Sequence, residues 1–254
     1  MIKQFFISFV FLFFYGQSNA QLVNIESKRM QLDSIRFALK SDLFFNHSNN
    51  NGGYLFQIGS SMTTQLKSKD LKKIYFFIGN YNLIRSKAQD FQNSWFFHLR
   101  YNQKLNNLFR FEAFVQNQNN ELLKINSRNL VGAGIRLKFI SKKSIKAYFG
   151  NSYMYEIENV KSTDKKYYNN RNSSYLSFSF NLPKSKLDLT STTYFQPLYS
   201  NINNHRILQQ FRSEIPISNS VSFSTLFDYF YNSFSPDEDK DFTSNLYFGL
   251  TFNI

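Results

Sequence analysis

The chain contains no cysteine, so it can form neither a disulfide framework nor a thiolate metal site, and thiol redox chemistry is excluded. Proline is also scarce, with four residues, and we expect all four to lie in turns, where no hydrogen-bond donor to a neighbouring strand is needed. The three histidines, His47, His98 and His205, are scattered along the chain and form no metal-ligand cluster. The sequence therefore predicts a protein without a metal or another cofactor.

Long apolar runs are missing beyond the first residues of the chain. Lys3 precedes the apolar block from Phe5 to Tyr15, and small and polar residues follow up to Ala20. This block is short against the roughly 20 residues that a spanning helix needs. The pattern predicts a secretory signal peptide at residues 1–20, cleaved after Ala20, followed by a periplasmic N-terminal lead at residues 21–34. Strands must then make any membrane crossing.

Acidic residues are outnumbered, with 17 Asp and Glu against 30 Lys and Arg, and the formal net charge is +13. Such an excess first suggests nucleic acid or an anionic surface as a partner. The basic residues, however, are spread along strands and turns, and an exported chain rarely meets nucleic acid. We therefore expect no nucleic-acid partner. The aromatic content of 19% with a mean hydropathy of −0.40 is typical of a barrel whose apolar band and polar lumen cancel in the average.

The stretch from Asp90 to Ile140 contains three long runs of alternating side chains. In the first run, Trp95, Phe97 and Leu99 share one face, while His98 and Arg100 lie on the other, because successive strand side chains point to opposite sides. Strands of soluble sheets usually last about five or six residues. These runs last about ten or more, which is long enough to cross a bilayer at a tilt. We expect aromatic side chains toward lipid and charged side chains toward a lumen.

The same alternation continues along the chain and predicts an all-β fold, a transmembrane antiparallel β-barrel of about twelve strands in a single domain at residues 35–254. Near residues 74–78 both faces are apolar, so the inward face is ambiguous there. The even-numbered connections look compact, whereas longer ones are expected at 159–170, 197–204 and 235–241, and a turn at 47–53. Bacterial barrels have short periplasmic turns and longer external loops, so this difference predicts that both termini face the periplasm.

The end of the chain resembles the terminal-strand signature by which outer-membrane barrels are recognised for assembly. Tyr247 and Gly249 occupy the polar and glycine positions, Phe252 the aromatic position, and Ile254 the last position, where an aromatic residue is commoner. The expected partners are therefore the barrel-assembly machinery and outer-membrane lipids, and a monomer is the favoured oligomeric state.

Two groups of charged residues are expected to face the lumen. The first comes from three consecutive strands: His98, Arg100, Arg110, Glu112, Arg128 and Arg136. The second comes from two later strands: Arg206, Arg212, Glu214 and Asp228. Buried charges must be paired, so we expect Glu112 to neutralise Arg100, Arg110 and Arg128. Two interpretations remain open, namely an interior filled by salt bridges and a basic constriction that selects anions.

A catalytic barrel is less well supported. A serine nucleophile needs a base within hydrogen-bond reach. His47 and Ser48 are adjacent and would face opposite ways on a strand, while His98 has no serine two residues away. We therefore expect no enzyme.

Several segments resemble the YdiY-like barrels, a family of salt-induced outer-membrane proteins whose function is unknown. They are Val23–Ser27, Phe97–Asn102 with Lys104–Asn106, Phe111–Gln116, Leu130–Arg136 and Tyr153–Glu156. The resemblance covers most of the chain after residue 20, is strongest from Phe97 to Glu156, and brings no catalytic residues. It implies an outer-membrane barrel of a Gram-negative bacterium. We expect a non-enzymatic role in envelope structure or stress response. A narrow channel for small anionic solutes is the alternative, and a lipid hydrolase comes third.

Overall fold

The computed structural model describes residues 36–50, 53–86, 92–120, 125–160, 165–183, 185–233 and 241–253. The expected signal peptide, the N-terminal lead and Ile254 lie outside these residues. The described part forms strands β1 (Phe37–Asn50), β2 (Gly53–Lys67), β3 (Lys73–Ser86), β4 (Gln92–Lys104), β5 (Phe109–Asn120), β6 (Ile125–Ser141), β7 (Ile145–Val160), β8 (Lys166–Leu182), β9 (Leu187–Leu198), β10 (Asn201–Pro216), β11 (Val221–Asn232) and β12 (Asp241–Asn253).

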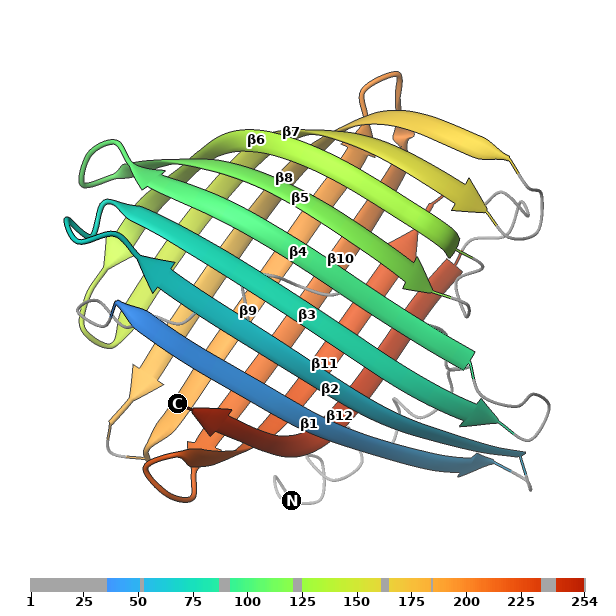
Figure 1. Ribbon diagram of the computed structural model, residues 1–254, viewed down its shortest axis with the longest axis horizontal. Helices are drawn as coiled ribbons and strands as arrows, with labels where there is room; N and C mark the ends of the chain where they lie inside the picture. Colours follow the sequence, from blue (N-terminus) through green and yellow to red (C-terminus); the bar gives the residue numbers. More distant parts are fainter. Residues whose placement is uncertain are drawn as a thin grey trace, which may run out of the picture.

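These strands form a closed antiparallel barrel in which each strand pairs with its neighbours in the sequence and β12 returns to β1 (Figure 1). The predicted twelve-stranded all-β barrel is confirmed. The β1–β12 register runs from the pair Lys40–Asn253 to the pair Phe45–Phe248. No helix within the described ranges is long and apolar enough to cross a membrane. We call the end of the barrel that carries the β2–β3, β4–β5, β6–β7, β8–β9 and β10–β11 connections the even end.

Alternation along each strand separates an apolar outer face from a mixed interior. On β11, Phe223 and Phe227 are exposed, whereas Ser224, Leu226 and Asp228 are buried. The ambiguity on β3 is resolved by packing: Phe76 and Ile78 are buried in a cluster with Phe96 of β4, so the even-numbered residues of β3 point inward. Both faces of β3 are apolar because one belongs to the apolar outer face and the other packs inside the barrel.

Several strands extend further than the sequence suggested, so the long connections expected at 159–170 and 197–204 are wrong, whereas most of the one expected at 235–241 lies outside the described residues. The expected turn at 47–53 is largely strand, since β1 and β2 pair as far as Asn50–Gly53. β8 begins at Lys166 rather than near residue 171, and only residues 199 and 200 separate β9 from β10. Pro197 consequently lies within β9, opposite His205, next to a register shift. The physical reason is that pairing with the neighbouring strand satisfies the backbone N–H and C=O groups of these polar residues, which in a loop would have to bond to water.

The β2–β3 turn is held by local hydrogen bonds. Asp70 accepts hydrogen bonds from the Ser68 hydroxyl and, at 3.1 Å, from the Lys72 backbone N–H. These two bonds, the first above all, hold the pKa of the Asp70 carboxyl below its ordinary value. Leu71 adopts a positive φ of 57°, which closes the turn.

Two glycines on the inner face of β6 allow close packing. A Cβ added to Gly134 would lie 2.1 Å from the backbone oxygen of Asn151 on β7, and one added to Gly132 would lie 2.3 Å from the ring of Phe114 on β5. Any larger residue would therefore push apart the strands or the aromatic side chains that fill the lumen.

Candidate functional site

Glu156 on β7 lies at the centre of the largest ion-pair group in the lumen and is fully buried. Arg206 of β10 donates to both of its carboxylate oxygens, at 3.0 and 2.7 Å. Arg128 of β6 donates through Nε at 2.6 Å, and Arg171 of β8 lies 3.4 Å away. Glu158 joins the group, accepting from Arg206 at 2.8 Å. We call these five residues the Glu156 cluster; its formal charge is +1.

A second group surrounds Glu112 of β5. Arg100 of β4 and Arg136 of β6 contact its two carboxylate oxygens at 3.4 and 3.7 Å. The hydroxyl of Tyr175 on β8 donates to it at 2.9 Å. Glu112 thus contacts Arg100, as expected, and Arg136 in place of Arg128. Arg128 lies farther from the even end along β6, where it contacts Glu156 instead.

Aromatic rings support the cations of this second group. The Arg136 guanidinium lies 3.8 Å from the centre of the Tyr148 ring, and Arg100 lies 5.4 Å from that of Phe114. Both contacts have the geometry of cation–π interactions. His98 stacks on Phe114, with ring centres 5.6 Å apart, and accepts a hydrogen bond from Arg100 Nε at 3.3 Å.

A third group links β1 and β10 near the even end. Arg212 donates to both oxygens of Asp42, at 2.6 and 3.3 Å, and also bonds Glu214. Lys40 Nζ lies 2.5 Å from Glu214 Oε1. The Thr251 hydroxyl of β12 donates to Asp42 at 2.7 Å. We call Lys40, Asp42, Arg212 and Glu214 the Asp42 cluster; its formal charge is zero.

The structure thus regroups the predicted lumen residues. His98, Arg100, Glu112, Arg128, Arg136, Arg206, Arg212 and Asp228 are buried, while Arg110 and Glu214 are partly buried. The predicted second set divides, since Arg206 joins Glu156 whereas Arg212 and Glu214 join Asp42. Asp228 accepts a hydrogen bond from Gln210. Of the predicted assembly residues, Tyr247 is buried in the lumen, Gly249 lies beside Leu43 of β1, and Phe252 is partly exposed.

Sequence reasoning missed five members of these clusters: Lys40, Asp42, Glu156, Glu158 and Arg171. Alternation places all of them on inward positions, so the same rule that selected the other residues could have selected these. What alternation cannot supply is the partner, because the ion pairs join strands that are not neighbours, such as β7 with β10 and β1 with β10.

Among the described residues, one small void lies at the middle of the lumen. A void of about 40 Å³ lies among side chains of β4 to β10, including Arg100, Arg128 and Tyr194. That volume has room for a few water molecules at most. A much larger hollow of about 460 Å³ opens at the even end and is lined by residues that include Lys40, Lys143 and Lys146.

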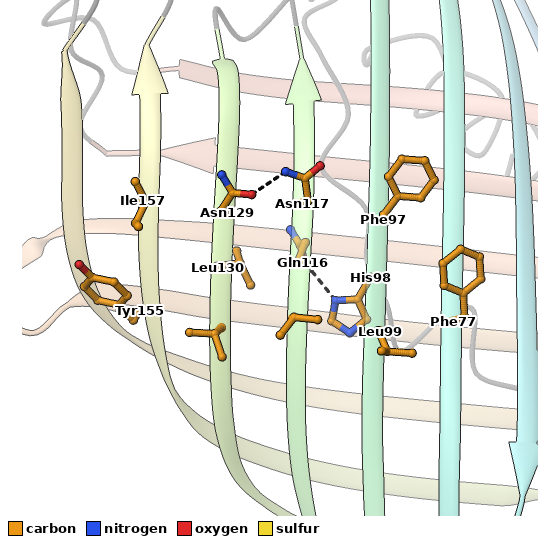
Figure 2. A pocket seen from close by; sticks show the side chains of 12 residues that line it. Phe77, Phe97, His98, Leu99, Gln116, Asn117, Asn129, Leu130, Tyr155 and Ile157 are labelled. Atoms are coloured by element: carbon orange, nitrogen blue, oxygen red, sulfur yellow. Dashed lines mark hydrogen bonds between the residues drawn. The ribbon is translucent and has the colours of Figure 1, made fainter.

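A third hollow of about 380 Å³ lies against the outward-facing side chains of β3 to β7 (Figure 2). Its outer walls include Phe77, Phe97 and Ile157, and an amide hydrogen bond of 2.5 Å joins Asn117 to Asn129. No Lys, Arg, Asp or Glu lines it. It is therefore a depression in the outer face whose lining also includes the inward residues His98, Gln116 and Leu130. Within the described ranges, no group of three or more His, Asp or Glu residues is placed to hold a metal ion.

Solved structures with a similar fold are outer-membrane barrels. A NanC porin has a TM-score of 0.55 at 9% identity, with 84% of this chain and 98% of that chain covered. A KdgM porin has a TM-score of 0.45 at 8% identity, with 84% and 98% covered. CymD, a monoaromatic hydrocarbon channel, has a TM-score of 0.46 at 8% identity, with 94% of each chain covered. At such identities the likeness concerns the fold alone, and only the NanC comparison is close enough to support it.

Sequence comparison gives the family. No curated protein matches the chain. A family model described as "Protein of unknown function, DUF481" matches residues 59–254, which is consistent with the resemblance to YdiY-like barrels noted from the sequence. The match spans most of the barrel, and the chain therefore belongs to this family of unknown function.

Proposed function

We propose that the protein is a non-enzymatic barrel of the cell outer membrane whose lumen is closed midway, with a role in envelope structure or stress response. The observation that carries this proposal is the contact between Arg206 of β10 and Glu156 of β7. These strands are separated around the barrel by β8 and β9. Their side chains therefore meet inside the lumen and leave little space for a solute.

The energetics of such a contact favour a permanent barrier. Burying ion pairs is costly, but removing one partner of a buried pair costs about 3–5 kcal/mol because a charge is left uncompensated. A solute that displaced Arg206 from Glu156 would have to compensate that loss. Thermal opening of the network is correspondingly rare, and closure is the resting state in this proposal.

A non-catalytic role is supported by the surroundings of His98. Its Nδ1 lies 3.2 Å from Gln116 Oε1, and its Nε2 accepts the Arg100 hydrogen bond. Both ring nitrogens are thus engaged by residues that cannot serve as nucleophiles. The proposal also retains a monomer with the even end toward the periplasm.

Conductance measurements test closure. Purified protein inserted in planar lipid bilayers should give no current steps above the bare membrane. Replacing both Arg206 and Glu156 with alanine removes the cross-lumen contact and should produce a measurable leak. As a control, the exposed pair Lys186 and Asp188 at the even end is replaced with alanine, which should leave the bilayer silent. Regular current steps from the unsubstituted protein would refute closure.

The second candidate is a narrow channel for small anionic solutes. It is favoured by the lysines around the even-end hollow, which would raise the local anion concentration. If current steps are observed, a reversal potential displaced toward that of chloride in a salt gradient would support this candidate. A cation-selective or unselective pore would argue against it.

Location is tested separately. The barrel should be recovered in the outer-membrane fraction and should migrate differently on electrophoresis before and after boiling, because a closed barrel resists detergent unfolding. Recovery as a soluble periplasmic protein would refute the membrane assignment.

A further inference from the structure

The even-end hollow has the size of a ligand site. Its volume of about 460 Å³ lies within the range of roughly 300–1,000 Å³ that is typical of small-molecule pockets. Its wall combines residues of β1 and of β7 to β12 with the turns that join them. We call this hollow the vestibule.

The Asp42 cluster forms the floor of the vestibule. Lys40 and Glu214 line the hollow directly, and behind them Arg212 bonds Glu214 and Asp42. Because this cluster is formally neutral, it adds no net charge to the vestibule. The charge of the vestibule is set by the residues around the floor.

Cationic side chains dominate those surroundings. Outside the Asp42 cluster, six inward positions in the part of the barrel next to the even end carry Lys or Arg: Lys67, Lys104, Arg110, Arg136, Lys138 and Lys146. Among the described inward residues there and outside that cluster, Glu112 and Asp188 carry the opposing charges, and Lys143 adds another positive charge at the rim. Asp188 already accepts a hydrogen bond from Asn181 at 2.5 Å, and Glu214 is engaged by Lys40 and Arg212.

We propose that the vestibule binds a small multivalent oxyanion, a solute that carries phosphate or carboxylate groups. Lysine ammonium groups act as point charges for such groups, and a concave site with low-dielectric walls focuses their field. Hydroxyl and amide groups in the wall, among them Thr190, Ser222 and Asn253, offer neutral hydrogen-bond partners. The proposal goes beyond a closed structural barrel, because a vestibule with a closed floor binds its ligand without passing it on.

Isothermal titration calorimetry tests this proposal, with protein folded in a neutral detergent at fixed ionic strength. Inorganic pyrophosphate and citrate are the probes. At least one should bind saturably with one site per barrel, and the tighter probe identifies the preferred group. Replacing Lys143 and Lys146 with glutamine should weaken binding at least tenfold. The matched control replaces Lys69 and Lys72, which lie on the β2–β3 turn outside the vestibule, and should change affinity less than twofold.

A second variant separates the cavity from its charge. Thr190→Tyr places a bulky side chain in the vestibule while keeping every lysine, and it should also abolish saturable binding. Unchanged binding by this variant, equal losses in the two lysine variants, or no saturable heat with either probe would each overturn the proposal. None of these results bears on lumen closure, which bilayer conductance measures independently.

Discussion

At the scale of single residues, substitution of Glu156 is expected to lower the stability of the barrel the most. Glu156→Gln removes the charge that Arg128, Arg171 and Arg206 share, and it should lower the free energy of unfolding by about 3–5 kcal/mol. Urea unfolding in lipid vesicles, followed by the fluorescence of Trp95, measures the change. Asp188→Asn also removes one carboxylate, but at an exposed site, and should cost less than about 0.5 kcal/mol. Similar losses in both variants would contradict the central place of Glu156.

Glycine packing gives a second residue-scale prediction. Gly134→Ala would bring Cβ against backbone atoms of Asn151 and Ser152, which cannot move aside as a side chain can, so it should destabilise the barrel by about 1–3 kcal/mol. Gly79→Ala is the matched control, since its nearest neighbours lie 3.5 Å away in the side chains of Phe77 and Phe97. The same unfolding experiment should find the control as stable as the parent. A neutral Gly134→Ala would mean that β6 and β7 can separate without cost.

Alternation made most of this interior predictable. Glu112, Arg128 and Arg212 are buried as the pattern indicated, because a one-residue shift would put every side chain on the other face. Their partners were not predictable, because whether Arg128 pairs with Glu112 or with Glu156 depends on its height along the barrel axis. That height depends on how neighbouring strands are staggered, which no single strand encodes.

At the scale of strands, the boundaries were the least predictable feature. Asn46 to Asn50 have the composition of a turn, yet they pair with β2 because the adjacent chain offers matching backbone groups. Asparagine tolerates both conformations, so composition could not decide between them. Pro197 was expected in a turn because proline has no backbone N–H to donate to a neighbouring strand, but a strand tolerates proline close to its end.

The last strand carries a prediction about assembly. Phe252 lies on the outward parity of β12, so Phe252→Asp puts a charge on the lipid-facing side of the strand expected to be recognised for insertion. The amount of barrel in the outer membrane should fall sharply. Asn253→Asp adds the same charge one residue away on the inward face, where Lys40 is the paired residue, and should insert normally. Quantitative immunoblotting of membrane fractions compares the two; equal insertion would argue against the terminal signature.

At the scale of the whole molecule, the Asp42 cluster spans the junction of the first and last strands. Asp42 of β1 accepts hydrogen bonds from Thr251 of β12, Ser61 of β2 and Arg212 of β10. Asp42→Asn should therefore accelerate amide hydrogen exchange in β1 and β12 more than in β6 and β7. Glu112→Gln, on the opposite side of the barrel, serves as the control and should leave β1 and β12 unchanged relative to the other strands. Uniform acceleration in both variants would show that the junction has no separate stability.

The same junction imposes an order of events on folding. Ser61 reaches Asp42 across 19 residues of chain, whereas Thr251 reaches it across 209. All other strand pairs join sequence neighbours, so a growing sheet can add one hairpin after another at modest entropic cost. Closing β12 on β1 is the single pairing that must wait for both ends of the sheet, and it belongs among the slow steps. Until then the sheet has two unpaired edges, which must be shielded from other chains. The Asp42 carboxylate also lacks its hydrogen bonds from Thr251 and Arg212 until the barrel closes.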